Sequence, residues 1–206
     1  MPASGPYAVP ECMIDPGRRQ APIREFAVAE TVMGGTDADG KAAPGPLAEP
    51  VARINEAVRA GRTAEAVELA GTTTDQAARM YGQDHPEVLG LRELTAYIAY
   101  LADDPLRSFR LSLDLARIRH RQHDPRAAYG NVQSAAAAWR AVRDPLQGLC
   151  LGQELLGVWD GLAAGAGPAA DDIGQLESAR TRMGRLAARA RARHEEDRGG
   201  ATAPQR

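Results

Sequence analysis

Ala102-Asp103-Asp104-Pro105-Leu106-Arg107-Ser108 is followed, forty residues later, by the related stretch Val142-Arg143-Asp144-Pro145-Leu146-Gln147-Gly148. The Asp-Pro step inside both recurs at Asp124-Pro125 and, with one residue inserted, at Asp84-His85-Pro86, so that the four aspartates lie twenty residues apart. An Asp carboxylate accepts hydrogen bonds from the N–H groups of a first helical turn, and Pro suits that turn because it needs no donor there. The spacing predicts four regular helix starts, and therefore a repeat of antiparallel helices that presents a surface.

Apolar residues recur at helical spacing from Leu47 to Leu162. Together with the Asp-Pro starts, this periodicity predicts helices at residues 47–59, 63–81, 86–102, 105–122, 125–142 and 145–162. A last helix is expected from about Ala170 to His194, packed on the array as a C-terminal cap, because a terminal repeat otherwise exposes an apolar side. Only 4% of the residues are aromatic, which favours closely packed helices over strands. The expected fold class is all-α.

Four segments are expected along the chain. They are a flexible N-terminal segment at 1–46, a helical repeat domain of about three helix pairs at 47–162, a linker and capping helix at 163–196, and a disordered tail at 197–206. Prolines and glycines interrupt the first segment, which favours extended or disordered chain. Two interpretations stay open for Phe26 within it: docking on the core, or a place in a flexible tail.

A second regularity defines the repeat unit. The residue before each of three helix starts is followed five positions later by a small residue, in the pairs Gly61 and Ala66, Asp103 and Ser108, Arg143 and Gly148. A small residue at a fixed point of a helix lets a neighbouring helix approach closely, as stacked helical hairpins require. The unit is therefore a helix pair about forty residues long.

The segment Tyr81-Gly82-Gln83-Asp84-His85-Pro86-Glu87-Val88-Leu89 resembles the joint between units of tetratricopeptide repeat (TPR) proteins, specifically the kinesin-light-chain-like repeats of the actinobacterial type. The resemblance covers about residues 47–162. Asp103 and Arg143 depart from it, because the family prefers Gly at these positions. The resemblance implies antiparallel helical hairpins stacked as a short right-handed superhelix, whose concave groove is lined by the first helix of each pair.

The resemblance also implies which residues face a partner in that groove. Carried over position by position, they are Val51, Asn55, Val58, Glu93, Tyr97, Tyr100, Gln133, Ala137 and Arg140. Tyr97 and Tyr100 offer rigid amphipathic contact area, and helical geometry places them on a face distinct from the core face. The amides of Asn55 and Gln133 suit a peptide backbone, and Arg140 suits a carboxylate. In the alternative interpretation, the tyrosines only fill space between repeats.

Motifs of catalysis are missing from the chain. It contains no glycine-rich phosphate loop after a strand, no nucleophile elbow and no His-Glu-x-x-His helix. His120 and His123 lie three residues apart, close enough to share a metal, but a third ligand is missing because Asp124 is expected to cap a helix. We therefore expect no enzymatic activity, no metal and no cofactor.

The charge and the cysteine content of the chain limit which partners and which cellular compartment are expected. A formal net charge of -2 gives no general attraction to nucleic acids. The arginine series from Arg180 to Arg193 leaves a nucleic-acid or acidic-partner surface open, although a solvated basic face is favoured. Cys12 and Cys150 are too few for a disulfide framework, which fits a reducing, cytoplasmic setting. No export signal and no run of about 18 apolar residues is present, so we expect no membrane partner.

These observations favour a non-catalytic adaptor or scaffold that binds another protein or a peptide in the concave groove. The first alternative is a structural subunit or a self-associating component of a larger assembly. A less favoured alternative is a nucleic-acid-associated regulatory accessory protein. In a variant of the first hypothesis, residues 1–46 lie in the groove and compete with the partner.

Overall fold

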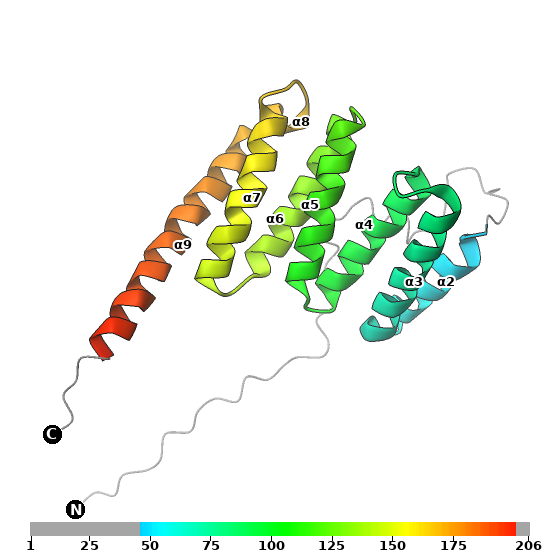
Figure 1. Cartoon of the computed structure of the whole chain (residues 1–206), viewed down its shortest axis with the longest axis horizontal. Helices are drawn as coiled ribbons and strands as arrows, with labels where there is room; N and C mark the ends of the chain where they lie inside the picture. The colour runs from blue at the N-terminus through cyan, green and yellow to red at the C-terminus, as the bar shows by residue number, and fades with distance from the viewer. Residues whose placement is uncertain (1–45, 201–206) are drawn as a thin grey trace, which may run out of the picture.

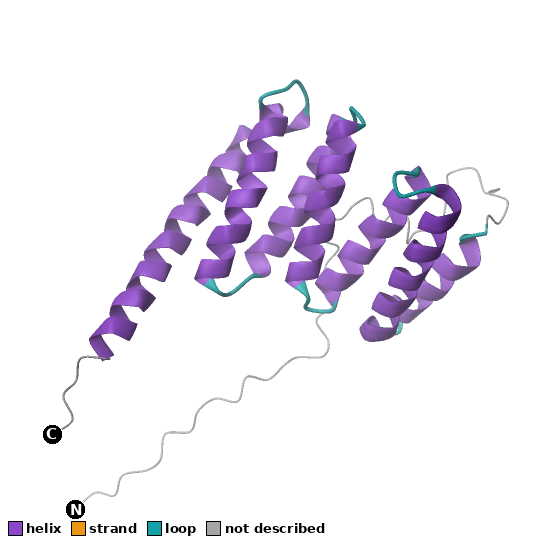
Figure 2. Ribbon diagram, viewed as in Figure 1, coloured by secondary structure: helices purple, strands orange, loops and turns teal. Residues whose placement is uncertain are grey.

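The computed structural model describes residues 46–200. Every regular element in that range is a helix, which confirms the all-α class (Figures 1 and 2). The helices are α2 (Ala48–Arg59), α3 (Thr63–Tyr81), α4 (Pro86–Leu101), α5 (Pro105–Arg121), α6 (Pro125–Ala141), α7 (Pro145–Ala163), α8 (Pro168–Asp171) and α9 (Ile173–Gly200). The interpretations of Phe26 and of the N-terminal segment as a groove ligand fall outside the described residues.

The six predicted repeat helices match α2 to α7 to within one residue at each end. The last helix differs from the prediction at both ends. Asp172 leaves helical geometry with φ -114° and ψ 55°, so a short helix, α8, precedes α9. The predicted end at His194 is wrong, because α9 continues to Gly200. Residues 195–198 contain no Pro or Gly, whereas Gly199 and Gly200 have the low helix propensity that suits an end.

All four predicted helix starts are present, and three of the four aspartates cap their helix. A carboxylate oxygen accepts from the backbone N–H three residues later in each case: Asp104 from Arg107 at 3.0 Å, Asp124 from Ala127 at 3.0 Å and Asp144 from Gln147 at 2.7 Å. At the fourth start only the predicted cap is wrong, because Asp84 does not cap α4. The inserted His85 takes the cap position, where its Nδ1 accepts from the N–H of Glu87 at 3.3 Å and its ring stacks on Tyr81 at 4.8 Å.

The turns between helices show where the repeat is regular. Gly61, Asp103 and His123 adopt positive φ values of 72°, 58° and 60° in three similar turns. The residue after each donates its N–H to a carbonyl five residues earlier, as from Asp104 to Ala99 at 2.9 Å. Arg143 has no such conformation: α6 ends instead in the extended residue Val142, with φ -68° and ψ 122°. The predicted equivalence of Arg143 with Gly61 and Asp103 is therefore wrong, because the apolar Val142 side chain turns inward, 6% exposed.

Successive helices from α2 to α7 run antiparallel and pack side by side, joined by short loops (Figure 1). One buried cluster joins α2, α3 and α4 around Ile54, Ala66 and Leu94. A larger cluster joins α5 to α9 around two tryptophans, Trp139 and Trp159. The predicted small positions Ala66, Ser108 and Gly148 are all buried.

Helix α9 packs along α7, and its C-terminal part projects beyond the start of α7 (Figure 1). The close approach depends on glycine. A Cβ on Gly148 would lie 3.2 Å from Leu186 Cδ1, and one on Gly152 would lie 2.7 Å from Trp139 Cζ2 and collide with Met183 Sδ. These positions let the middle of α9, at Met183 and Leu186, reach the backbone of α7.

Gly152→Ala is expected to lower the free energy of unfolding by about 1–3 kcal/mol, because the new methyl group overpacks the contact of α7 with Trp139 and Met183. Gly157→Ala in the same helix is the matched control. A Cβ there meets nothing within 4 Å, so Ala is expected to stabilise the helix by about 0.5–1 kcal/mol. Urea titrations followed by circular dichroism measure both changes, and equal stability of the two variants would contradict the packing described.

Candidate interaction surface

The predicted partner-facing residues differ widely in accessibility. Asn55, Glu93 and Tyr97 are buried, with 6%, 5% and 7% of their surface exposed. Val58 on α2, Tyr100 on α4 and Gln133 on α6 are half-buried. Arg140, in the last turn of α6, is exposed. Of the two further positions, Val51 is half-buried and Ala137 is buried. Of these residues only Arg140 is exposed, and the half-buried ones are spread over α2, α4 and α6.

The helices expected to line this surface contact each other directly. Tyr97 of α4 and Ala137 of α6 form one buried cluster, with Tyr100 packed against it. On the other side of α4, Leu94 and Ile98 share a cluster with residues of α2. Helices α2, α4 and α6 are therefore neighbours, although each belongs to a different predicted pair. Tyr97 fills space between helices, and its place in partner binding stays a prediction.

A buried polar cluster of Glu93, Arg119 and Asn131 connects α4, α5 and α6. Glu93 Oε1 accepts from Asn131 Nδ2 at 3.0 Å and from Arg119 Nη2 at 3.4 Å. The side chains of the ion pair are only 5% and 17% exposed. Glu93 Oε2 and Arg119 Nε are buried and have no hydrogen-bond partner in the structure. The carboxylate of Glu93 is thus engaged inside the array, where its charge is paired with that of Arg119.

Sequence reasoning missed both partners of Glu93. The resemblance to TPR proteins placed Glu93 in the groove, and helical geometry put it on the same face as Tyr97. The available signal was an acidic residue in the apolar run from Val88 to Leu101, where burial requires a cation or amide on a neighbouring helix. Nothing in the sequence selected Arg119 from the other arginines of residues 105–122.

Gln133 takes part in a polar contact at the opposite end of α6. The Tyr129 hydroxyl donates to Asp172 Oδ2 at 2.8 Å, which ties α6 to the break between α8 and α9. The pKa of Tyr129 is raised to about 12, first by burial and then by the hydrogen bond to Asp172 and its negative charge. A hydrogen bond with the Gln133 side chain acts in the opposite direction. The Gln133 amide is therefore engaged with Tyr129 of the same helix, and Tyr129 makes the contact with the C-terminal helices.

Four arginines gather where the end of α6 meets α9. Arg182 Nη2 donates to the carbonyl oxygens of Arg140 at 3.1 Å and Trp139 at 3.4 Å, and its Cζ lies 4.9 Å from the Trp139 ring centroid. Burial lowers the pKa of Arg182, and the positive charges of Arg189, Arg140 and Arg185 lower it further. We call these four residues, Arg140, Arg182, Arg185 and Arg189, the arginine cluster. The sequence had indicated α9 as basic, but not its contact with Arg140.

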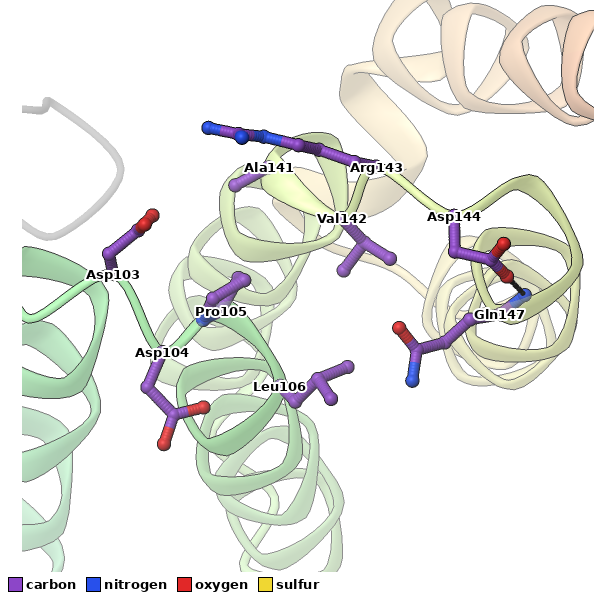
Figure 3. A pocket seen from close by; sticks show the side chains of 9 residues that line it. All are labelled: Asp103, Asp104, Pro105, Leu106, Ala141, Val142, Arg143, Asp144 and Gln147. Carbon is purple, nitrogen blue, oxygen red and sulfur yellow. Dashed lines mark hydrogen bonds between the residues drawn. The ribbon is translucent and has the colours of Figure 1, made fainter.

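A shallow pocket of about 410 Å³ lies at the same end of the array, against the turn between α6 and α7 (Figure 3). Leu106 and Val142 supply apolar walls, and Asp103 and Arg143 stand at its edge. Both Asp104 and Asp144 line the pocket, but each already caps a helix. The pocket is therefore a mixed apolar and charged hollow with no assembled catalytic group.

Residues 46–200 contain no group of three or more His, Cys, Asp or Glu side chains placed to hold a metal ion. His120 and His123 are both exposed. Among the helices of the same range, none combines the length and the apolar character needed to cross a membrane.

Comparison of the chain with protein-family models, with curated proteins and with solved structures found no match. Inference about function therefore depends on the contacts, charges and exposure of its own residues.

Proposed function

We propose that the chain is a non-catalytic cytoplasmic interaction module, an adaptor or scaffold, in which residues 47–162 form a short TPR-like stack. A partner protein or peptide binds along the side shared by α2, α4 and α6. The direct contact of Tyr97 with Ala137 carries this proposal, because it joins the first helices of two successive pairs. In a TPR-like stack, such contacts create one continuous surface from helices that are far apart in sequence.

The chemistry of the accessible residues supports a peptide or protein partner. Tyr100 and Gln133 are half-buried and Arg140 is exposed, so an aromatic ring, an amide and a guanidinium border the same side. Tyr offers contact area at low entropic cost, and Arg forms two parallel hydrogen bonds to a carboxylate. The buried Glu93 cluster holds α4, α5 and α6 in fixed relation, which preorganises the surface.

Site-specific photo-crosslinking tests the proposal. A photoreactive residue at Arg140 is expected to label a discrete partner in cells, whereas the same residue at Arg110 is expected to label none. Arg110 is the matched control because it is also an exposed arginine, but it lies on α5, a helix that does not line the proposed partner surface. Mass spectrometry identifies the labelled protein.

The purified partner is then titrated against three forms of the chain. Arg140→Glu is expected to weaken binding by at least about tenfold, and Arg110→Glu to change it by less than about twofold. Equal labelling from both positions, or unchanged affinity of the Arg140→Glu variant, would contradict the proposal. Cross-links only to a second copy of the chain would favour the self-associating alternative.

A further inference from the structure

Helix α9 carries a concentrated positive charge. Six arginines and no acidic residue lie between Arg180 and Arg193. Two of them are neutralised by aspartates of α7 and its cap: Arg180 Nη2 lies 2.7 Å from Asp160 Oδ1, and Arg193 Nη1 lies 3.3 Å from Asp144 Oδ2. No hydrogen bond or ion pair of the described residues joins Arg185 or Arg189 to an acidic group. Their charge is therefore uncompensated at the surface.

The arginines of the cluster share one side of α9. Arg182, Arg185 and Arg189 are three and four residues apart, which places them along one helical face. Arg182 contacts the C-terminal end of α6, so this face lies next to Arg140. The arginine cluster therefore extends the proposed partner surface from the C-terminal end of α6, where Arg140 is exposed, onto α9.

An internal repetition supports this continuity. Gln133, Ala137 and Arg140 of α6 recur forty-two residues later as Gln175, Ala179 and Arg182 of α9. Ala137 and Ala179 are both buried, at 4% and 7% exposed. The first part of α9 therefore repeats three residue types of α6 at the same spacing, with the alanine buried in both helices, although it lies beyond the predicted repeat domain.

Arg182 is the member of the arginine cluster whose side chain is held in place by contacts with α6. Its guanidinium is held over the Trp139 ring and against two carbonyl oxygens, while its Nε is buried and has no hydrogen-bond partner in the structure. Arg140, Arg185 and Arg189 lie near enough for their charges to act on it. Like charges held together in a partly desolvated place repel one another, and an anion bound among them relieves that repulsion.

We propose that the arginine cluster binds an acidic segment of a partner protein, with Arg185 and Arg189 pairing with Asp or Glu side chains beside the fixed Arg182. The inference rests on the proposed function, because it names the chemistry of a partner on the same side of the array. From Arg185 to Arg189 the helix rises about 6 Å, which an extended peptide spans in about two residues whose side chains point to the same face. A segment with acidic residues at alternate positions fits this spacing.

The surroundings favour a peptide over a nucleic acid. Arg180 and Arg193 are already paired with Asp160 and Asp144, so a longer polyanion that continued past the cluster would meet arginines whose charge is compensated. A formal net charge of -2 provides no long-range attraction to such a polymer. A short acidic segment meets the arginines without meeting these aspartates.

Fluorescence anisotropy with the full chain tests the inference. The probe is a fluorescein-labelled twelve-residue peptide in which Glu alternates with Gly or Ser, titrated at low ionic strength. Arg185→Glu with Arg189→Glu is expected to weaken binding by at least about tenfold, equal to about 1.4 kcal/mol. Arg110→Glu with Arg121→Glu reverses two exposed arginines of α5 and changes the net charge equally, so it is expected to have less than about a twofold effect.

The outcomes separate this inference from the proposed function. Equal weakening by both double variants would show only a response to net charge and overturns the inference. Tighter binding of a duplex oligonucleotide than of the peptide, lost in the α9 variant, would assign the cluster to nucleic acid and overturns it too. If the cross-linked partner needs Arg140 but tolerates both α9 substitutions, the proposed function stands and this inference fails. If neither the Arg140 substitution nor the α9 double substitution affects binding of that partner, both the proposed function and this inference fail.

Discussion

Glu93→Ala is expected to lower the free energy of unfolding by about 3–5 kcal/mol, although the sequence placed this residue on a partner surface. The carboxylate accepts hydrogen bonds from Asn131 and Arg119, and its loss leaves the Arg119 charge uncompensated at 17% exposure. An unpaired, partly buried cation is costly because it has lost most of its water. Urea denaturation followed by circular dichroism measures the change.

The matched control removes both charges at once. In Glu93→Leu with Arg119→Leu, apolar side chains replace the ion pair, so most of the stability lost in Glu93→Leu alone is expected to return. Asn131 keeps its second bond, from Nδ2 to the carbonyl oxygen of Ala127 at 3.0 Å. A single variant within about 0.5 kcal/mol of the parent chain would contradict the buried role, since that is the range of surface substitutions. Glu93 would then become a stronger candidate for direct partner contact.

Trp139→Ala is expected to cost about 3–5 kcal/mol, the range for removing a large buried aromatic side chain. Trp139 is 1% exposed in the cluster that joins α5 to α9. Its Nε1 donates to the carbonyl oxygen of Gly148 at 2.6 Å, and Arg182 lies over its ring. The side chain therefore holds together α6, α7 and α9, and its removal is expected to loosen all three contacts.

Substitutions of the two buried tryptophans distinguish the contribution of a hydrogen bond to stability from the contribution of packing. Trp159 is 2% exposed, but its indole N–H has no hydrogen-bond partner in the structure. Trp139→Phe removes the bond to the Gly148 carbonyl, which keeps its place in the hydrogen bonding of α7, whereas Trp159→Phe removes an unpaired donor. The first substitution is therefore expected to cost about 0.5–1.5 kcal/mol more, the net contribution of one hydrogen bond. Thermal and urea unfolding of both variants provide the comparison. Equal losses would mean that the Gly148 bond adds nothing beyond packing.

Local sequence signals predicted the helices well because both ends of each helix depend on neighbouring residues. Asp104, Asp124 and Asp144 each cap through the backbone three residues ahead, so their effect is visible in sequence. The errors are also local. One inserted residue moved the cap of α4 from Asp84 to His85, and Val142 kept the α6–α7 turn from matching those at Gly61 and Asp103.

The candidate surface was harder to predict because it depends on residues far apart in the chain. The spacing of Glu93, Tyr97 and Tyr100 placed them on one helical face, but it carried no information about which neighbouring helix covers that face. Glu93 is paired across 26 and 38 residues with Arg119 and Asn131, and Arg182 reaches α6 across 42 and 43 residues. Such contacts follow from the stacking of pairs, which the local periodicity does not encode.

The core around Trp139 extends past residue 162, where the repeat pattern ends, so a fragment of the chain cannot be chosen from the repeat pattern alone. Leu176, Ala179 and Leu186 of α9 belong to the same buried cluster as Phe109 and Trp139. A fragment cut after residue 162 would expose these tryptophan-lined contacts to water, although the repeat pattern ends there. Helices α5 to α7 and the last helix thus share one core, and a truncated form that lacks α9 is expected to be less stable than the full chain.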